Sequence, residues 1–382
     1  MNRLFIKRIC QYRIYAIHKI IYFFKLFLLF KMYFNFFLII PLAFVSAFQK
    51  LDSGLLPFWY PIMTGKQFQQ KKIHNITVMN HPMVLYNNHI NHSMILHTDI
   101  CPHQGASLSK GWVNEFGNIQ CPYHGFEFCN GMFCKIPNPS LSPPTFKSRI
   151  KLPVYPVRQY NDTLFFFPIS NHLMNDSSPF FPPEEYDPSF RSVSGSIVVH
   201  KNWLVICENL LDMLHISYVH SFGSRVNPLP YSVRTLFKNN VSGITEFYYQ
   251  PRDLTISNQI GRVTTVIVQN EYHLPTNTIT RVFAGNVVKT VFTRSLPLSK
   301  DRTILFWRVY RNFWIDPYLP IFSIIGDVIL RFLMEKTIQE DVSILKYVYP
   351  EYRQGPLKTK YDTTIHNFRN AVQHYLNQSD TL

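Results

Sequence analysis

The chain has 382 residues, of which 46% are apolar, so it is long enough for one large or two medium domains with a buried core. Its formal net charge of +15 is uneven, because residues 1–50 hold eight Lys or Arg and no Asp or Glu. The rest of the chain carries 30 basic against 23 acidic residues, an excess too diffuse for a nucleic-acid-binding protein. This mild surplus favours docking of an acidic protein partner.

The segment 1–50 is predicted to be a signal, targeting or membrane-anchor segment, because it is basic and then strongly apolar between residues 32 and 48. One interpretation is a membrane anchor, in which Lys25 and Lys31 would be costly at the bilayer centre. The other is a signal peptide that begins at Met32. The junction at 46–48, Ser-Ala-Phe, resembles the start of plastid-targeting presequences. We therefore expect a thylakoid or plastid-envelope location, with the endoplasmic reticulum membrane as the alternative.

Residues 56–170 are predicted to form an all-β domain. Short alternating runs of apolar residues are broken there by Asn, Gly and Pro, which is typical of half-buried strands joined by turns. These runs lie at 76–79, 83–86, 94–97 and 164–167. A linker rich in Pro, Ser and Asn is predicted at 171–191.

Two cysteine–histidine pairs lie within this predicted domain. Cys101 and His103 form the first pair, and after seventeen residues Cys121 and His124 form the second. Pro and Gly beside each pair favour two tight loops. Such a set fits a [2Fe–2S] cluster with two cysteines on one iron and two histidines on the other. The alternative is a Cys₂His₂ zinc site, but zinc modules usually keep their two cysteines roughly two to four residues apart.

Two further cysteines, Cys129 and Cys134, flank the hairpin signal Asn130-Gly131. Their offset from the turn does not place them directly opposite each other in a two-residue hairpin. We therefore expect reduced, partly buried thiols and no disulfide framework.

The second constellation lies in residues 208–220, which are predicted to form one helix. His215 and His220 are five residues apart, so they can converge on one metal if the helix tightens or opens between them. Asp212 lies three residues before His215, on the same predicted helix face. A single histidine on such a helix is more often a structural residue, and it is the combination with the upstream cysteine–histidine pairs that indicates a second metal site.

Residues 192–377 are predicted to form an antiparallel sheet covered by helices on one side. Long strand-like runs lie at 263–268, 278–283 and 303–310. An apolar stretch at 318–334 is predicted to be a soluble or membrane-apposed helix at the rim of a substrate pocket. It precedes a helical segment at 337–344 that holds Glu340 and Asp341.

At these motifs the chain resembles the Rieske non-haem iron oxygenases. The two cluster loops lack the extra cysteine that each loop carries in the respiratory Rieske proteins, and residues 212–220 match the family's Asp-x-x-His-x-x-x-x-His element. The resemblance implies an α+β fold. It consists of an all-β Rieske domain with two cluster-binding loops at 56–170 and a helix-grip-like catalytic domain of antiparallel sheet and helices at 192–377. The membrane-associated eukaryotic members, such as chlorophyllide and pheophorbide oxygenases and Rieske sterol desaturases, are the most similar.

The same resemblance implies a site. A [2Fe–2S] cluster would bind Cys101, His103, Cys121 and His124. A mononuclear Fe(II) would bind His215, His220 and a later carboxylate. Asp341 is favoured over Glu340 as this third ligand. The residues expected to be catalytic are Asp212, as the carboxylate that joins the iron's histidine to the Rieske histidine of a neighbouring subunit, and Asn209.

The implied activity is an O₂-dependent monooxygenase that receives electrons from a ferredoxin or ferredoxin-type reductase and oxidises an apolar substrate, with a chlorophyll-type tetrapyrrole favoured. A sterol desaturase or hydroxylase of the same family is the first alternative. The other alternative is a non-oxygenating Rieske redox component of a membrane complex. The resemblance also implies a homotrimer, and we expect membrane association and no nucleic-acid partner.

Overall fold

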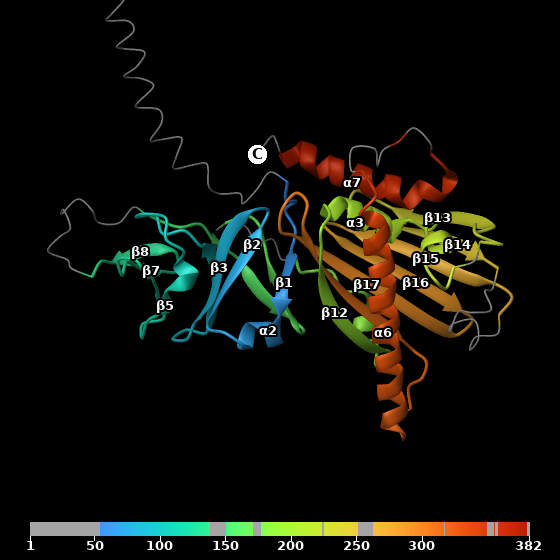
Figure 1. The fold of residues 1–382 in the computed structure, drawn as a ribbon, viewed down its shortest axis with the longest axis horizontal. Coiled ribbons are helices and arrows are strands. Elements are labelled where there is room, and N and C mark those ends of the chain that lie inside the picture. Colours follow the sequence, from blue (N-terminus) through green and yellow to red (C-terminus); the bar gives the residue numbers. More distant parts are fainter. Residues whose placement is uncertain are drawn as a thin grey trace, which may run out of the picture. The chain divides into compact units, whose positions relative to one another are not determined.

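The computed structural model describes residues 54–137, 150–170, 177–223, 225–250, 263–316, 318–349, 355 and 358–379, and the fold is shown in Figure 1. The described residues belong to one compact unit of the chain, 51–382. The predicted targeting or anchor segment at 1–50 lies outside the described residues.

The first domain consists of three small antiparallel sheets. One has the order β1-β11-β10, another β2-β3-β4-β9 and the third β5-β6-β7-β8. Their bounds are β1 Tyr60–Thr64, β2 Ile73–Val78, β3 His81–Asn88, β4 Ser93–Thr98, β5 Trp112–Val113, β6 Ile119–Gln120, β7 Glu127–Cys129, β8 Met132–Lys135, β9 Val154–Tyr155, β10 Val157–Tyr160 and β11 Thr163–Phe166, with a short helix α2 at Gly65–Gln69 and a 3₁₀ turn at Leu108–Lys110. The predicted all-β domain is confirmed.

Strand β2 shows how alternation along a strand contributes to the core of this domain. In β2, for example, Ile76 and Val78 are buried while Asn75 between two inward positions is exposed, as expected of a strand with one covered face. These side chains join a cluster that also contains Leu85 of β3 and Leu296 of a strand in the second domain. The two domains therefore share part of one hydrophobic core.

The second domain is built on a seven-stranded antiparallel sheet with the order β12-β18-β17-β16-β15-β14-β13. The strands are β12 Arg191–Val199, β13 Ser232–Lys238, β14 Ser242–Tyr249, β15 Val266–His273, β16 Asn277–Ala284, β17 Val287–Pro297 and β18 Thr303–Arg311. The helices are α3 Trp203–Leu211, α4 Ile216–Val219, α6 Pro320–Leu345 and α7 Thr363–Ser379, with 3₁₀ turns at Pro183–Glu185 and Lys360–Asp362.

The helices of this domain lie over one face of the sheet, as Figure 1 shows for α3 and α6. Tyr272 of β15 packs against Phe368 of α7, with ring centroids 5.6 Å apart. Val268, on the same face of β15, lines a cavity whose opposite wall comes from α6. The expected antiparallel sheet with helices on one side is therefore confirmed.

The single helix predicted at 208–220 is wrong, because the chain leaves helical geometry at Asp212. Helix α3 ends at Leu211, and Asp212 has the extended angles φ −79° and ψ 124°. Its carboxylate accepts a hydrogen bond of 2.7 Å from the backbone N–H of Leu214, a local bond that competes with the helical pattern. His215 and His220 therefore flank the separate short helix α4 rather than sharing one long helix.

The two C-terminal segments predicted at 318–334 and 337–344 form one continuous helix, α6. A buried stripe at helical spacing, which includes Leu330, Met334, Ile338 and Asp341, faces the sheet. Among the described residues, no helix is long and apolar enough to cross a membrane.

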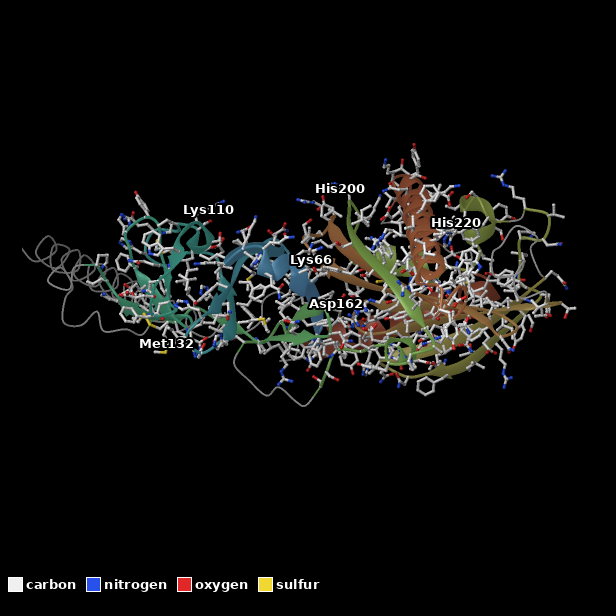
Figure 2. All side chains as sticks on the ribbon, turned by 90° about the horizontal axis from the view of Figure 1, so that it is seen from below. Lys66, Lys110, Met132, Asp162, His200 and His220 are labelled. Carbon is white, nitrogen blue, oxygen red and sulfur yellow. A yellow bond between two sulfur atoms is a disulfide. The ribbon has the colours of Figure 1, made fainter. Side chains whose placement is uncertain are left out.

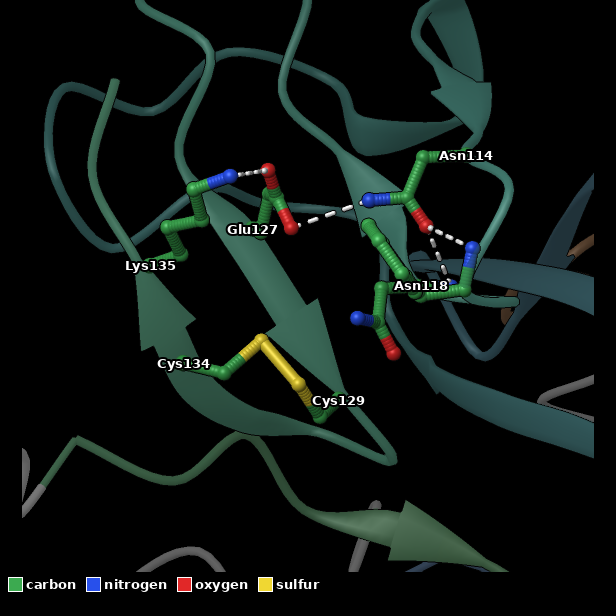
Figure 3. Close-up of a disulfide and its surroundings, with 7 residues drawn as sticks. Asn114, Asn118, Glu127, Cys129, Cys134 and Lys135 are labelled. Atoms are coloured by element: carbon green, nitrogen blue, oxygen red, sulfur yellow. Dashed lines mark hydrogen bonds and ion pairs between the residues drawn. A yellow bond between two sulfur atoms is a disulfide. The ribbon is translucent and has the colours of Figure 1, made fainter.

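The prediction of free thiols at Cys129 and Cys134 is also wrong, because the two form a disulfide with their Cα atoms 5.9 Å apart (Figure 3). As the sequence suggested, Cys129 lies opposite Met132 rather than opposite Cys134. However, the register of the β7–β8 hairpin shifts between Glu127 and Phe128. Such an irregularity bends the strand, so it accounts for two offset cysteines coming within bonding distance.

Candidate metal centres

The two cysteine–histidine loops have nearly the same backbone geometry. In the first loop the N–H of Cys101 donates to the Ala106 carbonyl, and in the second the N–H of Cys121 donates to the Phe126 carbonyl, both at 2.8 Å. In each loop a glycine N–H also donates back to the cysteine carbonyl, at 2.8 Å from Gly105 and 3.0 Å from Gly125. These glycines have φ of +76° and +71°, a backbone region that favours glycine.

All four predicted cluster ligands come together at these loops. The Cys101 and Cys121 side chains are both buried, and burial together with the adjacent Cys121 thiol raises the pKa of Cys101. The Nδ1 atoms of His103 and His124 are 3.1 Å apart, and these two rings are exposed and half-buried, respectively. Two buried sulfur donors and two outward imidazole donors are the arrangement that a cluster with Cys₂ on one iron and His₂ on the other requires.

A second set of donors converges between α4 and α6. The Nε2 atoms of His215 and His220 are 3.2 Å apart, and Asp341 Oδ1 lies 3.3 Å from the first and 3.5 Å from the second. The two histidines are the residues that cap α4, whereas Asp341 comes from the buried stripe of α6. Figure 2 shows His220 beside α6.

This second set fits a metal cation. Asp341 Oδ1 is buried and has no hydrogen-bond partner among the described residues, so a carboxylate oxygen faces two imidazole nitrogens with nothing else to bind it. A group of two histidines and one carboxylate with further coordination positions open is typical of non-haem Fe(II) oxygenases.

Two other carboxylates lie behind the histidines. Glu340 Oε2 is 3.0 Å from His220 Nδ1, and Asp212 Oδ2 is 3.8 Å from His215 Nδ1. The geometry thus places Asp341 at the convergence point and Glu340 on the far side of one ring. Asn209 is not brought to the site: it lies on α3, its backbone carbonyl accepts the N–H of Asp212 at 3.1 Å, and it does not line the cavity.

Burial and neighbouring charges act differently on the titratable groups here. Burial raises the pKa of Asp212, and His215 opposes that shift. For His215, burial disfavours the charged form, but Asp341 and Asp212 outweigh it and raise the pKa. Burial lowers the pKa of His220 in spite of Asp341. His220 therefore favours the neutral imidazole, which is the form that ligates a metal.

The convergence point opens into a largely apolar cavity of about 310 Å³. The sheet contributes one wall through Val266, Val268, Val282, Val291 and Val309. Helix α6 contributes the opposite wall through Leu330, Leu333 and Met334. Sequence reasoning missed Lys289 and Phe222, which also line the cavity. The one signal for Lys289 in the sequence is a basic residue within the strand-like run VVKTV at 287–291.

Comparison with protein-family models matches both domains. The Rieske [2Fe-2S] domain model matches residues 58–156, and the vanillate O-demethylase oxygenase C-terminal domain model matches residues 199–378.

Curated relatives match part of the chain. Over 170 residues it is 33% identical to the chloroplastic protochlorophyllide-dependent translocon component 52 of Arabidopsis thaliana, a match that covers 42% of this chain and 30% of that protein. Over 222 residues it is 28% identical to the chloroplastic chlorophyllide a oxygenase of Chlamydomonas reinhardtii, which covers 56% of this chain and 33% of that protein. The chain thus spans about a third of the length of these relatives.

Solved structures share the fold. Dicamba monooxygenase bound to 3,6 dichlorosalicylic acid has a TM-score of 0.66 at 20% identity, over 85% of this chain and 98% of that one. NdmA of Pseudomonas putida CBB5 with caffeine has a TM-score of 0.67 at 19% identity, over 85% and 92%. At these identities the likeness concerns the fold alone.

The fold and the two family matches define a two-domain protein with a Rieske domain followed by an oxygenase catalytic domain. The chain belongs to the Rieske non-haem iron oxygenase family. A Rieske domain holds a [2Fe–2S] cluster, and oxygenases of this family carry a mononuclear iron in the catalytic domain.

Proposed function

We propose that this chain is a Rieske monooxygenase that oxidises an apolar substrate held in the 310 Å³ cavity. The observation that carries the proposal is the convergence of His215, His220 and Asp341 at the wall of this cavity, in the same chain as the two cluster loops. A pure electron carrier needs the loops but has no use for a buried three-donor set that opens into an apolar cavity.

In this proposal the bound cluster and iron supply electrons and activate O₂. The protein's own residues position the reaction. Glu340 holds the His220 ring so that Nε2 faces the cavity, and Asp212 lies behind His215. The valine face of the sheet and the leucines of α6 bind an apolar substrate and exclude water.

We further propose that a ferredoxin-type protein docks at the exposed cluster loops, and that the enzyme is a homotrimer. The surplus of basic residues outside 1–50 supports an acidic redox partner. No contact within the described part of the chain joins Asp212 to His103 or His124, so a path from cluster to iron through Asp212 calls for a second copy. A fully active monomer, seen by sedimentation together with turnover, would contradict the trimer.

The names of the relatives support a chlorophyll-type tetrapyrrole as substrate and a plastid location, since chlorophyllide a oxygenase and pheophorbide a oxygenase are both chloroplastic proteins. Mass spectrometry of small molecules that co-purify with the protein tests the substrate. A sterol in place of a tetrapyrrole would favour the sterol desaturase alternative.

His220→Ala tests the oxygenase directly. We expect the wild type to hold roughly three iron atoms per chain, two in the cluster and one in the catalytic domain. The variant should lose the third iron and O₂-dependent turnover, yet keep the EPR signal of the reduced cluster. His200→Ala, which removes an exposed histidine outside the cavity, is the matched control and should behave as wild type.

The rival function is electron transfer without oxygenation, which the translocon-component name of one relative favours. A His220→Ala variant that retains full function, or a wild type that holds two irons when fully loaded, would support this carrier and refute the oxygenase.

We also propose that the first half of α6 lies against a bilayer. Apart from Arg331, its most exposed side chains are apolar, with Val328 63% and Phe332 65% exposed. Its one acidic residue, Asp327, turns to Arg311 and Arg191 and presents no free negative charge. Because α6 also forms the cavity wall, an apolar substrate would pass from lipid to the site along one helix.

A fluorophore attached at Ile325→Cys should be quenched by brominated lipids in vesicles that contain phosphatidylglycerol. The same label at Gln339→Cys, exposed on the second half of α6, should not be quenched. Equal quenching at both positions, or none at either, would refute the membrane-facing role of this helix whether or not segment 1–50 anchors the chain.

A further inference from the structure

One cavity residue has no role in the proposed chemistry. Lys289 of β17 projects from the sheet into the apolar cavity, and its register places it across from Val282 on β16 and Arg311 on β18. The neighbouring inward position on the same strand is Val291, which lines the same wall. Lys289 is therefore a cation in a cavity wall to which the sheet contributes mainly valine side chains.

Lys289 has no hydrogen bond or ion pair with any residue that the structure describes. Its one described contact is with an aromatic ring, since its Nζ lies 5.9 Å from the centroid of Phe222. The adjacent Arg311 does not share a carboxylate with it: the Arg311 guanidinium is bound by Asp327 and by the backbone carbonyls of Trp314 and Ser323.

An unpaired ammonium in such a wall is unfavourable. Its surroundings disfavour the charged form, and burial lowers the pKa of Lys289. A charged side chain kept in an apolar cavity is stabilised when an anion pairs with it there. The carboxylates of Asp212 and Asp341 face the histidines instead and form no ion pair with Lys289.

We propose that Lys289 is a specificity residue that binds an acidic group of the substrate. The substrate class is then an apolar molecule with one carboxylate or a similar anion. This inference rests on the proposed function, because it assumes that the cavity is the substrate site.

The contacts also place the Lys289 ammonium relative to the candidate iron ligands. The Phe222 ring stacks on the His220 ring, with centroids 5.0 Å apart and planes inclined by 14°. Lys289 lies over the same Phe222 ring, so its ammonium is one aromatic ring away from a proposed iron ligand. A substrate whose acid group is held by Lys289 would present a carbon some way along its apolar body to the donors, rather than the acid group itself.

The test compares two probes of the same shape, 2-naphthoic acid and its neutral amide, 2-naphthamide. Their affinities for the metal-loaded full chain are measured by calorimetry at pH 7.5, where the acid is ionised. We expect the wild type to bind the acid at least about tenfold more tightly, the effect of one charge-assisted hydrogen bond. Lys289→Met should bring the ratio of the two affinities close to one, and Lys289→Arg should keep a preference for the acid.

Lys300→Met serves as the matched control, because this lysine lies on the same domain but is exposed and outside the cavity. It should retain the preference for the acid. Equal affinity of the wild type for acid and amide would overturn the proposal. So would a preference that survives Lys289→Met, since the carboxylate would then be bound elsewhere, for example at the metal.

These outcomes are separable from those of the oxygenase test. Binding of the two probes needs no turnover. A wild type with three irons and O₂ consumption but no preference for the acid would overturn only the proposed role of Lys289. A Lys289-dependent preference in a protein that lacks the third iron would overturn the oxygenase function and support the acid-binding role of Lys289.

Discussion

Glu340 and His220 form a pair in which the carboxylate Oε2 lies 3.0 Å from the ring Nδ1, while Nε2 of the same ring faces Asp341. Adjacent residues of α6 therefore act on opposite sides of one imidazole. A carboxylate behind a metal-binding histidine fixes its tautomer and ring orientation.

Glu340→Gln should weaken binding of the mononuclear iron by about tenfold and leave the cluster intact, because an amide holds the His220 ring without a charge. Competition with an Fe(II) chelator measures the affinity. Glu335→Gln on the same helix, an exposed residue paired with Arg331 at 3.8 Å, is the control and should bind iron as wild type does. Unchanged affinity in Glu340→Gln would show that the pair does not support the site.

The two loop glycines should differ in their tolerance of alanine. Both have a positive φ, so each substitution costs about 1 kcal/mol of backbone strain. A Cβ at Gly105 meets nothing within 4 Å, whereas one at Gly125 would lie 2.7 Å from Pro137 Cγ. Gly125→Ala should therefore lose much more cluster than Gly105→Ala, measured by visible absorption per chain. Equal loss in both variants would show that φ alone matters.

Loss of the Cys129–Cys134 disulfide should lower the free energy of unfolding by about 2 kcal/mol. Thermal unfolding with and without reductant measures this effect. Cys129→Ser, Cys134→Ser and the double variant should all be destabilised equally and should no longer respond to reductant. A wild type whose unfolding temperature ignores reductant would argue against the bond.

Asp327→Asn should destabilise the second domain by about 3 kcal/mol, because it leaves the Arg311 charge buried without its carboxylate. The ion pair, at 2.8 Å, joins β18 to α6, which carries Asp341. Denaturant unfolding measures the loss. The exposed-pair variant Glu335→Gln should change stability by less than about 0.5 kcal/mol. A similar small change in Asp327→Asn would mean that water compensates Arg311.

The cluster loops were readable from the sequence because all the information is local. A cysteine, a histidine two or three residues later and the following glycine set both the donors and the turn, as in Cys101, His103 and Gly105. The apolar runs that became β2, β3 and β4 are local in the same sense. Strand β2 alternates because one face is covered, whereas the run at 83–86 in β3 is buried throughout because both of its faces are covered.

Features that depend on distant partners were harder to predict. Glu340 and Asp341 are equivalent in sequence terms, and the rotation of α6 against the sheet directs one to the histidines' Nε2 atoms and the other to Nδ1 of His220. The Cys129–Cys134 bond depended on a register shift in the hairpin, and no residue type in the sequence predicts that shift.

The linear order of residues thus established the chemistry of the protein: which donors it has, which metals suit them and which family it resembles. Three-dimensional packing decided how these donors are used. It brought Asp341 across more than a hundred residues to His215 and His220, and it placed Lys289 of β17 in the wall of the largely apolar cavity. The reason is physical. Ligand type and turn geometry depend on neighbouring residues, whereas the side of a helix or strand that points inward depends on the surfaces that the element buries.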